Sequence, residues 1–171
     1  MSPVRQQGEE GSCTGHGTAA GMNYLCRDNP SQEPHDKCTV YSPRFAYYNA
    51  RRYGGANQLR QDNGAFIRNA IKGVVYYGVC PDSDWPYQPG EYKKAPTPAQ
   101  LRAGQSWMLD KYLKCLTLNG VLSALHKGHP IVAGFMCHTG MWKDEVTKTG
   151  VLPVPTDADQ PDGGHCTLWC G

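Results

Sequence analysis

The two ends of this chain carry side chains with complementary chemistry, and a fold that uses them together must bring these ends side by side. Gln7 stands six residues before Cys13, which follows a Gly-Ser pair. A thiol at a helix start, beside a side-chain amide donor, combines the nucleophile and the oxyanion donor that acyl transfer from an amide requires. The general base is expected far away in sequence, and His165 lies 152 positions after Cys13 (165 − 13).

Helix signals dominate the first part of the chain. Ser42 can cap a helix, with Pro43 at the first position, where the missing N–H costs nothing. Asn63 can cap another helix, in which apolar residues recur at i, i+3, i+4 and i+7 from Ile67. The first helix contains glycines, which weaken it but permit the close approach of another element. The expected helices run over residues 13–25, over 43–52 and onward from Asn63, and residues 27–39 and 81–104 are expected to be loops.

Strand signals replace helix signals in the last third of the chain. A short helix is expected to stop at Gly128, and Pro130 then admits a strand over residues 131–135. A second strand should contain residues 165–169. Helices followed by strands are the α+β pattern. We therefore expect a mainly helical part over residues 1–112, whose first ten or so residues can cross over, and a β-rich part over 113–171 that carries His165.

Five segments occur in the order in which one enzyme family carries them. They are residues 7–13, 42–48, 62–64, 77–87 and 148–165. In this order they resemble the papain family of cysteine peptidases, in the form seen in bacterial and viral members. That family separates its cysteine and histidine by about 130–150 residues. The resemblance implies an α+β fold of two lobes, a helical left lobe and a β-rich right lobe, with a cleft between them.

The resemblance also implies a role for each candidate residue. Cys13 would attack a peptide bond as a thiolate paired with the His165 imidazolium, forming a thioester acyl-enzyme, as a thiol endopeptidase does. Gln7 would donate its amide N–H to the oxyanion. The residues expected to bind the substrate are Asn63 and Gly64 in a turn that pairs with the peptide backbone, Gly134 in a roomy pocket, and Gly164 near the scissile bond.

The sequence departs from the family pattern after its histidine. The family orients that histidine with a later asparagine in an Asn-Ser-Trp motif, and no such motif follows His165 here. We therefore expect an incomplete right lobe, either in a core fragment of a longer protein or in a shortened member. A partner chain or self-association could cover its exposed sheet edge.

Two other functions use the same residues. One is a papain-like module that is weak or inactive as a catalyst and serves as a binding or structural component of a larger assembly. The missing asparagine motif favours it, and the intact Gln7, Cys13 and His165 argue against it. The other is a different amide-directed Cys-His hydrolase or transferase, such as a glutaminase. It shares the chemistry but lacks support from the segment at residues 62–64.

The eight cysteines show no C-x-x-C pair. Glu10 and residues 62–63 occupy the places where secreted relatives carry a bridged pair. We expect the seven cysteines other than Cys13 to be mostly reduced and buried, which favours a reducing compartment, and a Cys26–Cys38 bridge is the alternative. Cysteine and histidine spacings around Cys13 and Cys166 lack the paired pattern of zinc sites, so no metal and no cofactor are expected.

Charge and hydropathy exclude several partners. The formal net charge is +2 with both signs interspersed, so there is no basic footprint for nucleic acid or an anionic membrane. No apolar run approaches the roughly 18 residues that a membrane span needs. Residues 1–5 do not resemble a secretory signal. The expected partner is a peptide or protein substrate, and no motif assigns a compartment.

Overall fold

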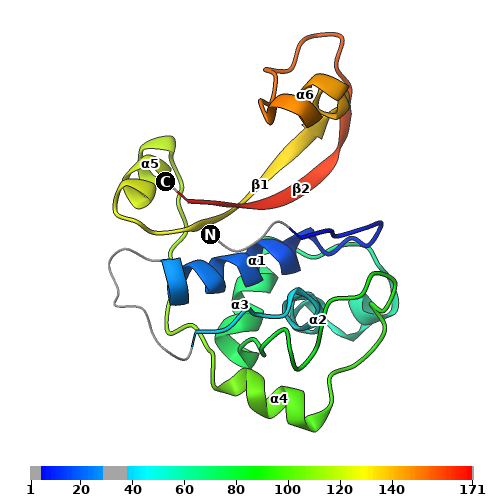
Figure 1. Ribbon diagram of the computed structural model, residues 1–171, viewed down its shortest axis with the longest axis vertical. Coiled ribbons are helices and arrows are strands. Elements are labelled where there is room, and N and C mark those ends of the chain that lie inside the picture. Colours follow the sequence, from blue (N-terminus) through cyan, green and yellow to red (C-terminus); the bar gives the residue numbers. More distant parts are fainter. Residues whose placement is uncertain (1–4, 29–37, 171) are drawn as a thin grey trace.

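The computed structural model describes residues 5–28 and 38–170 of the chain, which form helices first and strands last (Figure 1). Figure 1 shows the sheet lying across one side of the first helix, with the other long helices on its opposite side. The elements are α1 (Cys13–Asn23), η1 (Tyr24–Asp28), α2 (Pro43–Gly54), η2 (Ala56–Arg60), α3 (Ile67–Tyr77), α4 (Pro98–Gln105), α5 (Leu118–His126), β1 (Ile131–His138), η3 (Thr139–Trp142), α6 (Asp144–Thr149) and β2 (Pro161–Trp169).

The glycines of α1 let this central helix contact elements on two sides. A Cβ atom on Gly15 would lie 2.6 Å from the Pro43 carbonyl oxygen, so only glycine allows α2 to approach this closely. On the other side, a Cβ on Gly17 would lie 3.1 Å from the sulfur of Cys166 in β2. The predicted helix over residues 13–25 is shorter as an α-helix, because it continues into the π-helical turn η1 after Asn23.

The starts of α2 and α3 differ in how well the sequence predicts them. The Ser42 side chain accepts a hydrogen bond from the Phe45 N–H at 3.1 Å, which confirms the predicted cap. The prediction that Asn63 caps α3 is wrong, because Phe66 is its N-cap and Asn63 instead donates to the Gln61 side chain. Gly64 has a positive φ of 74°, which interrupts any helix starting at Asn63.

The segment 81–104, expected to be a loop, contains the start of α4. Thr97 and Gln100 form a reciprocal capping box at this helix start, with Pro98 at its first position. The Thr-x-x-Gln spacing and the proline were visible in the sequence as a helix signal. The loop prediction missed this helix because the surrounding prolines and glycines outweighed that short motif.

The strands β1 and β2 form a two-stranded antiparallel sheet, with Phe135 opposite His165 and Gly134 opposite Cys166. Both strands extend beyond the predicted ranges. The expected β-rich lobe is therefore met only in part, because residues 113–170 also form the helices α5 and α6. In the described part of the chain, no helix is long and apolar enough to cross a membrane.

A disulfide joins Cys26 in η1 to Cys38, with 5.6 Å between the Cα atoms. The expectation that these two cysteines are reduced is therefore wrong, and the alternative bridge is the one that forms. The two residues stand twelve apart in sequence, and their Cα separation is within the range that a disulfide requires. The cysteine pattern therefore no longer favours a reducing compartment. Cys80, Cys137 and Cys166 are free and buried.

Candidate active site

Cys13 is the first residue of α1 and is half-buried. The preceding residue, Ser12, makes no side-chain cap to the helix. Its hydroxyl instead contacts the Tyr87 hydroxyl at 2.6 Å and lies 3.4 Å from His16 Nδ1. The N–H groups of the first turn of α1 therefore remain without a side-chain acceptor from the cap residue. Such a helix start stabilises negative charge on a nearby thiolate.

Gln7 is held by the main chain of the loop that leads to Cys13. Its side-chain Nε2 donates to the Glu10 carbonyl at 2.7 Å, and its own carbonyl accepts from the Tyr87 hydroxyl at 2.8 Å. The Ser12 N–H also donates to the Glu10 carbonyl. The second N–H of the Gln7 amide has no protein partner among residues 5–28 and 38–170 and can serve an incoming group.

A buried ion pair anchors this loop to α2. Arg44 and Glu10 are paired through both carboxylate oxygens at 2.6 and 2.9 Å, and the Glu10 side chain is 1% exposed. The same carboxylate accepts from the Gly90 N–H, and Arg44 also donates to the Gln88 carbonyl. The sequence gives no sign of this pair, because Arg44 and Glu10 stand 34 positions apart and no local pattern connects them.

Asp62 joins the nucleophile loop to the turn at residues 62–64. Its carboxylate accepts from the Gly11 N–H at 3.0 Å and from the Tyr47 hydroxyl at 2.5 Å. A Cβ on Gly11 would lie 3.0 Å from the Gly64 nitrogen, so the two backbones pass in close contact. Burial and the hydrogen bond to Asp62 raise the pKa of Tyr47, which keeps this donor protonated. The Asp62 carboxylate thus links the nucleophile loop, α2 and the turn at residues 62–64.

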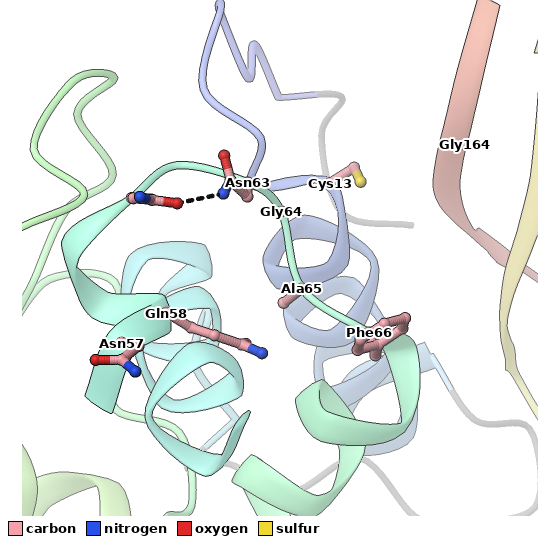
Figure 2. Close-up of a pocket in the computed structure, with 9 residues that line it drawn as sticks. Cys13, Asn57, Gln58, Asn63, Gly64, Ala65, Phe66 and Gly164 are labelled. Atoms are coloured by element: carbon pink, nitrogen blue, oxygen red, sulfur yellow. Dashed lines mark hydrogen bonds between the residues drawn. The ribbon is translucent and has the colours of Figure 1, made fainter. Parts of the chain in front are cut away.

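A pocket of about 480 Å³ lies beside Cys13. Figure 2 shows the Cys13 thiol between the turn that carries Asn63 and Gly64 and the strand that carries Gly164. Four of the predicted site residues therefore line one cavity, while Gln7, His165 and Gly134 are not among its lining residues. The full lining is Cys13, Asn57, Gln58, Gln61, Asn63, Gly64, Ala65, Phe66 and Gly164.

His165 follows Gly164 in β2 and is half-buried. Its ring meets the edge of Phe135 on β1, with 6.0 Å between the ring centroids. Among the described residues, no hydrogen bond joins His165 to Cys13 and neither of its ring nitrogens has a hydrogen-bond partner. The pKa of His16 in α1 is lowered mainly by burial, and the charges of Arg5, Arg44 and His165 lower it further. His165 therefore lies close enough to the start of α1 to act on His16.

His16 and Gly134 are two neighbours of the site. His16 lies in the first turn of α1, and its ring packs edge-on against Tyr87, with centroids 4.4 Å apart. Gly134 is expected to leave room for a substrate side chain. In the structure, a Cβ on Gly134 would lie 2.8 Å from Ile67 Cδ1, so Ile67 occupies this space. No group of three His, Cys, Asp or Glu side chains in the described ranges could hold a metal ion.

Burial lowers the reactivity of two other thiols near Cys13, those of Cys166 and Cys137. It raises the pKa of Cys166 to about 12, with the nearby Cys13 as a second cause. It also raises the pKa of Cys137, again with a contribution from Cys13. Both thiols therefore stay protonated at neutral pH and are poor nucleophiles.

Comparison with known proteins gives similarity over nearly the whole chain. No protein-family model matches it. Over 96% of its length the chain is 30% identical to an uncharacterized peptidase C1-like protein of Acanthamoeba polyphaga mimivirus, of which it covers 54%. Among solved structures it is similar to xylellain, a cysteine protease from Xylella fastidiosa, with a TM-score of 0.77 and 30% identity over 98% of this chain and 66% of that one. The chain thus spans about half to two thirds of these relatives.

Proposed function

Because this chain belongs to the papain-like family of cysteine peptidases and shares its fold, we propose that it hydrolyses peptide bonds with Cys13 as nucleophile and His165 as general base. One observation carries the proposal. Cys13, the half-buried first residue of α1, shares a pocket with the Gly64 turn and with Gly164, the neighbour of His165. A peptide in this pocket contacts the Cys13 thiol and lies beside Gly164, the residue that precedes His165 in β2.

The chemistry follows from these positions. The Cys13 thiolate attacks the carbonyl carbon, and its sulfur bonds to that carbon while the carbonyl oxygen becomes an oxyanion. The second N–H of Gln7 Nε2 and the backbone N–H of Cys13 donate to this oxygen. The His165 imidazolium gives its proton to the leaving amine, which leaves a thioester. Water then loses a proton to His165 and attacks the thioester, which releases the acid and restores the thiolate.

Labelling with an epoxide peptide tests this assignment. Cys13 should be modified faster than any other cysteine at pH 5–6, because in the proposed pair the His165 imidazole makes its thiol the better nucleophile. The variant His165→Ala should lose both labelling at this pH and peptide hydrolysis, while Cys115→Ser, a half-buried thiol outside the pocket, serves as the control. Peptide mass mapping identifies the modified residue. Equal labelling of Cys13 and Cys115 at acid pH would contradict a thiolate–imidazolium pair.

A binding module without turnover is the second candidate. It is favoured by the His165 ring, because no hydrogen bond from the described residues orients its nitrogens. An imidazole without an orienting partner can rotate or adopt the wrong tautomer. Such a module would bind peptides with an affinity that is the same in wild type and in Cys13→Ala, and it would cleave none. Calorimetry of peptide binding, together with mass analysis of the peptide afterwards, separates the two functions.

A further inference from the structure

One side of the pocket beside Cys13 is formed by carboxamides. The segment from η2 to the Gly64 turn contributes Asn57, Gln58, Gln61 and Asn63, and none of the nine lining residues is Asp, Glu, Lys, Arg or His. Figure 2 shows the labelled members of this group on one side of Cys13 and the strand with Gly164 on the other. We call these four residues the carboxamide segment.

The backbone of the carboxamide segment is fixed from beneath by a buried arginine. Arg51 of α2 is fully buried, and its Nη1 donates to the carbonyls of Gln58 and Gln61, each at 3.4 Å. Its Nη2 donates to the Tyr92 carbonyl, and its guanidinium lies 4.2 Å from the Tyr47 ring centroid. The segment is therefore held in place before any ligand binds, as is usual for specific pockets.

The one carboxylate between Asn57 and Asn63 is turned away from the pocket. Asp62 stands between Gln61 and Asn63, but its two oxygens accept from the Gly11 N–H and the Tyr47 hydroxyl. A charged ligand group in the pocket would lose water without gaining a counter-charge from the lining residues. Asn63 and Gln61 pair with each other, but an apolar group would offer no hydrogen-bond partner to the carboxamides of Asn57 and Gln58.

We propose that the carboxamide segment selects peptides with a glutamine or asparagine within three residues of the cleaved bond. The inference rests on the proposed peptidase function and specifies its substrates. A carboxamide ligand carries both donors and acceptors, so it can pair with Gln58 in either orientation and can accept from Gln61, whose side-chain oxygen already accepts from Asn63 at 2.7 Å. An extended peptide advances about 3.3 Å per residue, so a pocket that contains both Cys13 and Gly64 lies within reach of such a position.

Phe66 distinguishes between the two amides. Its ring is 73% exposed at the edge of the pocket, where it can contact the methylene groups of a longer side chain. Glutamine has one methylene more than asparagine and is the preferred ligand for that reason. The four carboxamides are exposed or half-buried, so the expected discrimination is about tenfold, well below that of a fully buried hydrogen-bonding site.

Two substitutions test the segment in opposite directions. Gln58→Leu replaces the carboxamide with a shorter apolar side chain and removes the hydrogen-bonding groups, so it should reduce the preference for glutamine to twofold or less, a loss of about fivefold. Gln61→Glu supplies a negative charge and should raise cleavage of lysine peptides about tenfold relative to leucine peptides. Gln105→Leu, at the exposed end of α4, is the matched control and should keep the wild-type profile.

The experiment uses internally quenched peptides that place Gln, Leu, Glu or Lys at one position at a time, with kcat/KM as the readout and mass spectrometry to locate the cut. The wild type should favour Gln at one position near the cut. A flat or apolar preference in the wild type, or an unchanged profile in both pocket variants, overturns the proposal. Melting temperatures establish that the variants are folded.

Failure of the peptidase function itself is recognised separately. If the epoxide does not label Cys13 and no peptide is cut, the proposed chemistry is wrong. The amide preference is then measured as binding of the same peptides to Cys13→Ala by fluorescence anisotropy. Glutamine peptides that bind this variant about tenfold more tightly than their leucine counterparts support the carboxamide segment, and equal affinities overturn it.

Discussion

The helical part of the molecule (α1–α4) and its sheet part (α5–β2) are stabilised in different ways. The helical part contains a continuous buried core around Phe45, Val74 and Trp85. In the sheet part, large apolar side chains such as Val154 are mostly exposed, and Val154 itself is 85% exposed. Apolar burial is the main favourable contribution to folding, so the helical part carries most of the stability.

The sheet part is therefore ordered mainly by its contact with α1. This contact is made where Gly17 meets Cys166 and where Gly21 meets Leu168. For the proposed chemistry, this means that the two reacting side chains are positioned by differently stabilised parts of the molecule. Cys13 stands on the rigid part, whereas the placement of His165 depends on how closely β2 packs against α1. The four predictions below test this difference, from the largest expected effect to the smallest.

The largest effect is expected from Arg44→Ala in the helical part. Removing one member of a buried ion pair leaves the Glu10 carboxylate uncompensated, which costs about 3–5 kcal/mol in the free energy of unfolding. The measurement is urea denaturation. The double variant with Glu10→Gln should recover part of this loss, because the unpaired charge is gone. A double variant that loses the sum of the two single effects would show that the pair has no coupling.

The disulfide tests whether the end of α1 adds to the same stability. Cys26→Ser with Cys38→Ser opens a loop whose ends are twelve residues apart, and the expected loss is about 2–3 kcal/mol. A reducing agent should lower the melting temperature of the wild type and leave that of the double variant unchanged. Cys115→Ser is the control for removing a free thiol. An unchanged melting temperature under reduction would mean that η1 contributes little to the helical part.

Local rules predicted those elements whose signals lie within a few residues. The Ser42-Pro43 start of α2 is such a case, because the cap and its partner N–H are three positions apart. The start of α3 was misplaced, since the positive φ of Gly64 depends on the close contact with Gly11 and not on the neighbouring sequence. The disulfide was judged unlikely because sequence spacing does not show which Cβ atoms meet.

The candidate site shows the same limit. Cys13, Asn63, Gly64 and Gly164 were recognised through a family resemblance, and they line one pocket. The buried arginines that hold this pocket, Arg44 and Arg51, were not recognised. An arginine in a sequence is usually a solvated surface charge, and its hydrogen-bond acceptors are known only from the fold. Burial of a charge is a property of the tertiary contacts and is therefore hidden from periodicity.

Substitutions at two glycines of α1 test two different contacts. Gly15 faces α2 within the helical part, and Gly17 faces β2 of the sheet part. Gly15→Ala places a methyl group 2.6 Å from a backbone oxygen and from Tyr47 Cβ, and should cost about 2–3 kcal/mol. Gly17→Ala meets the sulfur of Cys166 at 3.1 Å, which can shift, and should cost about 1 kcal/mol or less.

The second measurement for this pair is the rate of epoxide labelling at Cys13. Gly17→Ala should slow labelling more than its small effect on stability suggests, because it displaces the strand that carries His165. Gly15→Ala should slow it only to the extent that the protein unfolds. Both rates are measured at a temperature where each variant is folded. A normal labelling rate in Gly17→Ala would mean that docking of β2 does not control the placement of His165.

The last comparison uses a matched pair of valines, one in each part, and includes the smallest single effect, that of Val154→Ala. Val74→Ala removes two methyl groups from a side chain that is 1% exposed, and should cost about 1–3 kcal/mol through lost transfer energy and a cavity. Val154→Ala changes an exposed side chain of the sheet part and should stay within about 0.5 kcal/mol of the wild type. Urea denaturation of both variants measures the difference.

Equal losses would mean that the apolar surface of the sheet part is covered in solution by a second copy of the chain. Sedimentation over a range of concentrations then identifies that self-association, and a monomer with equal losses would contradict the contrast between the two parts.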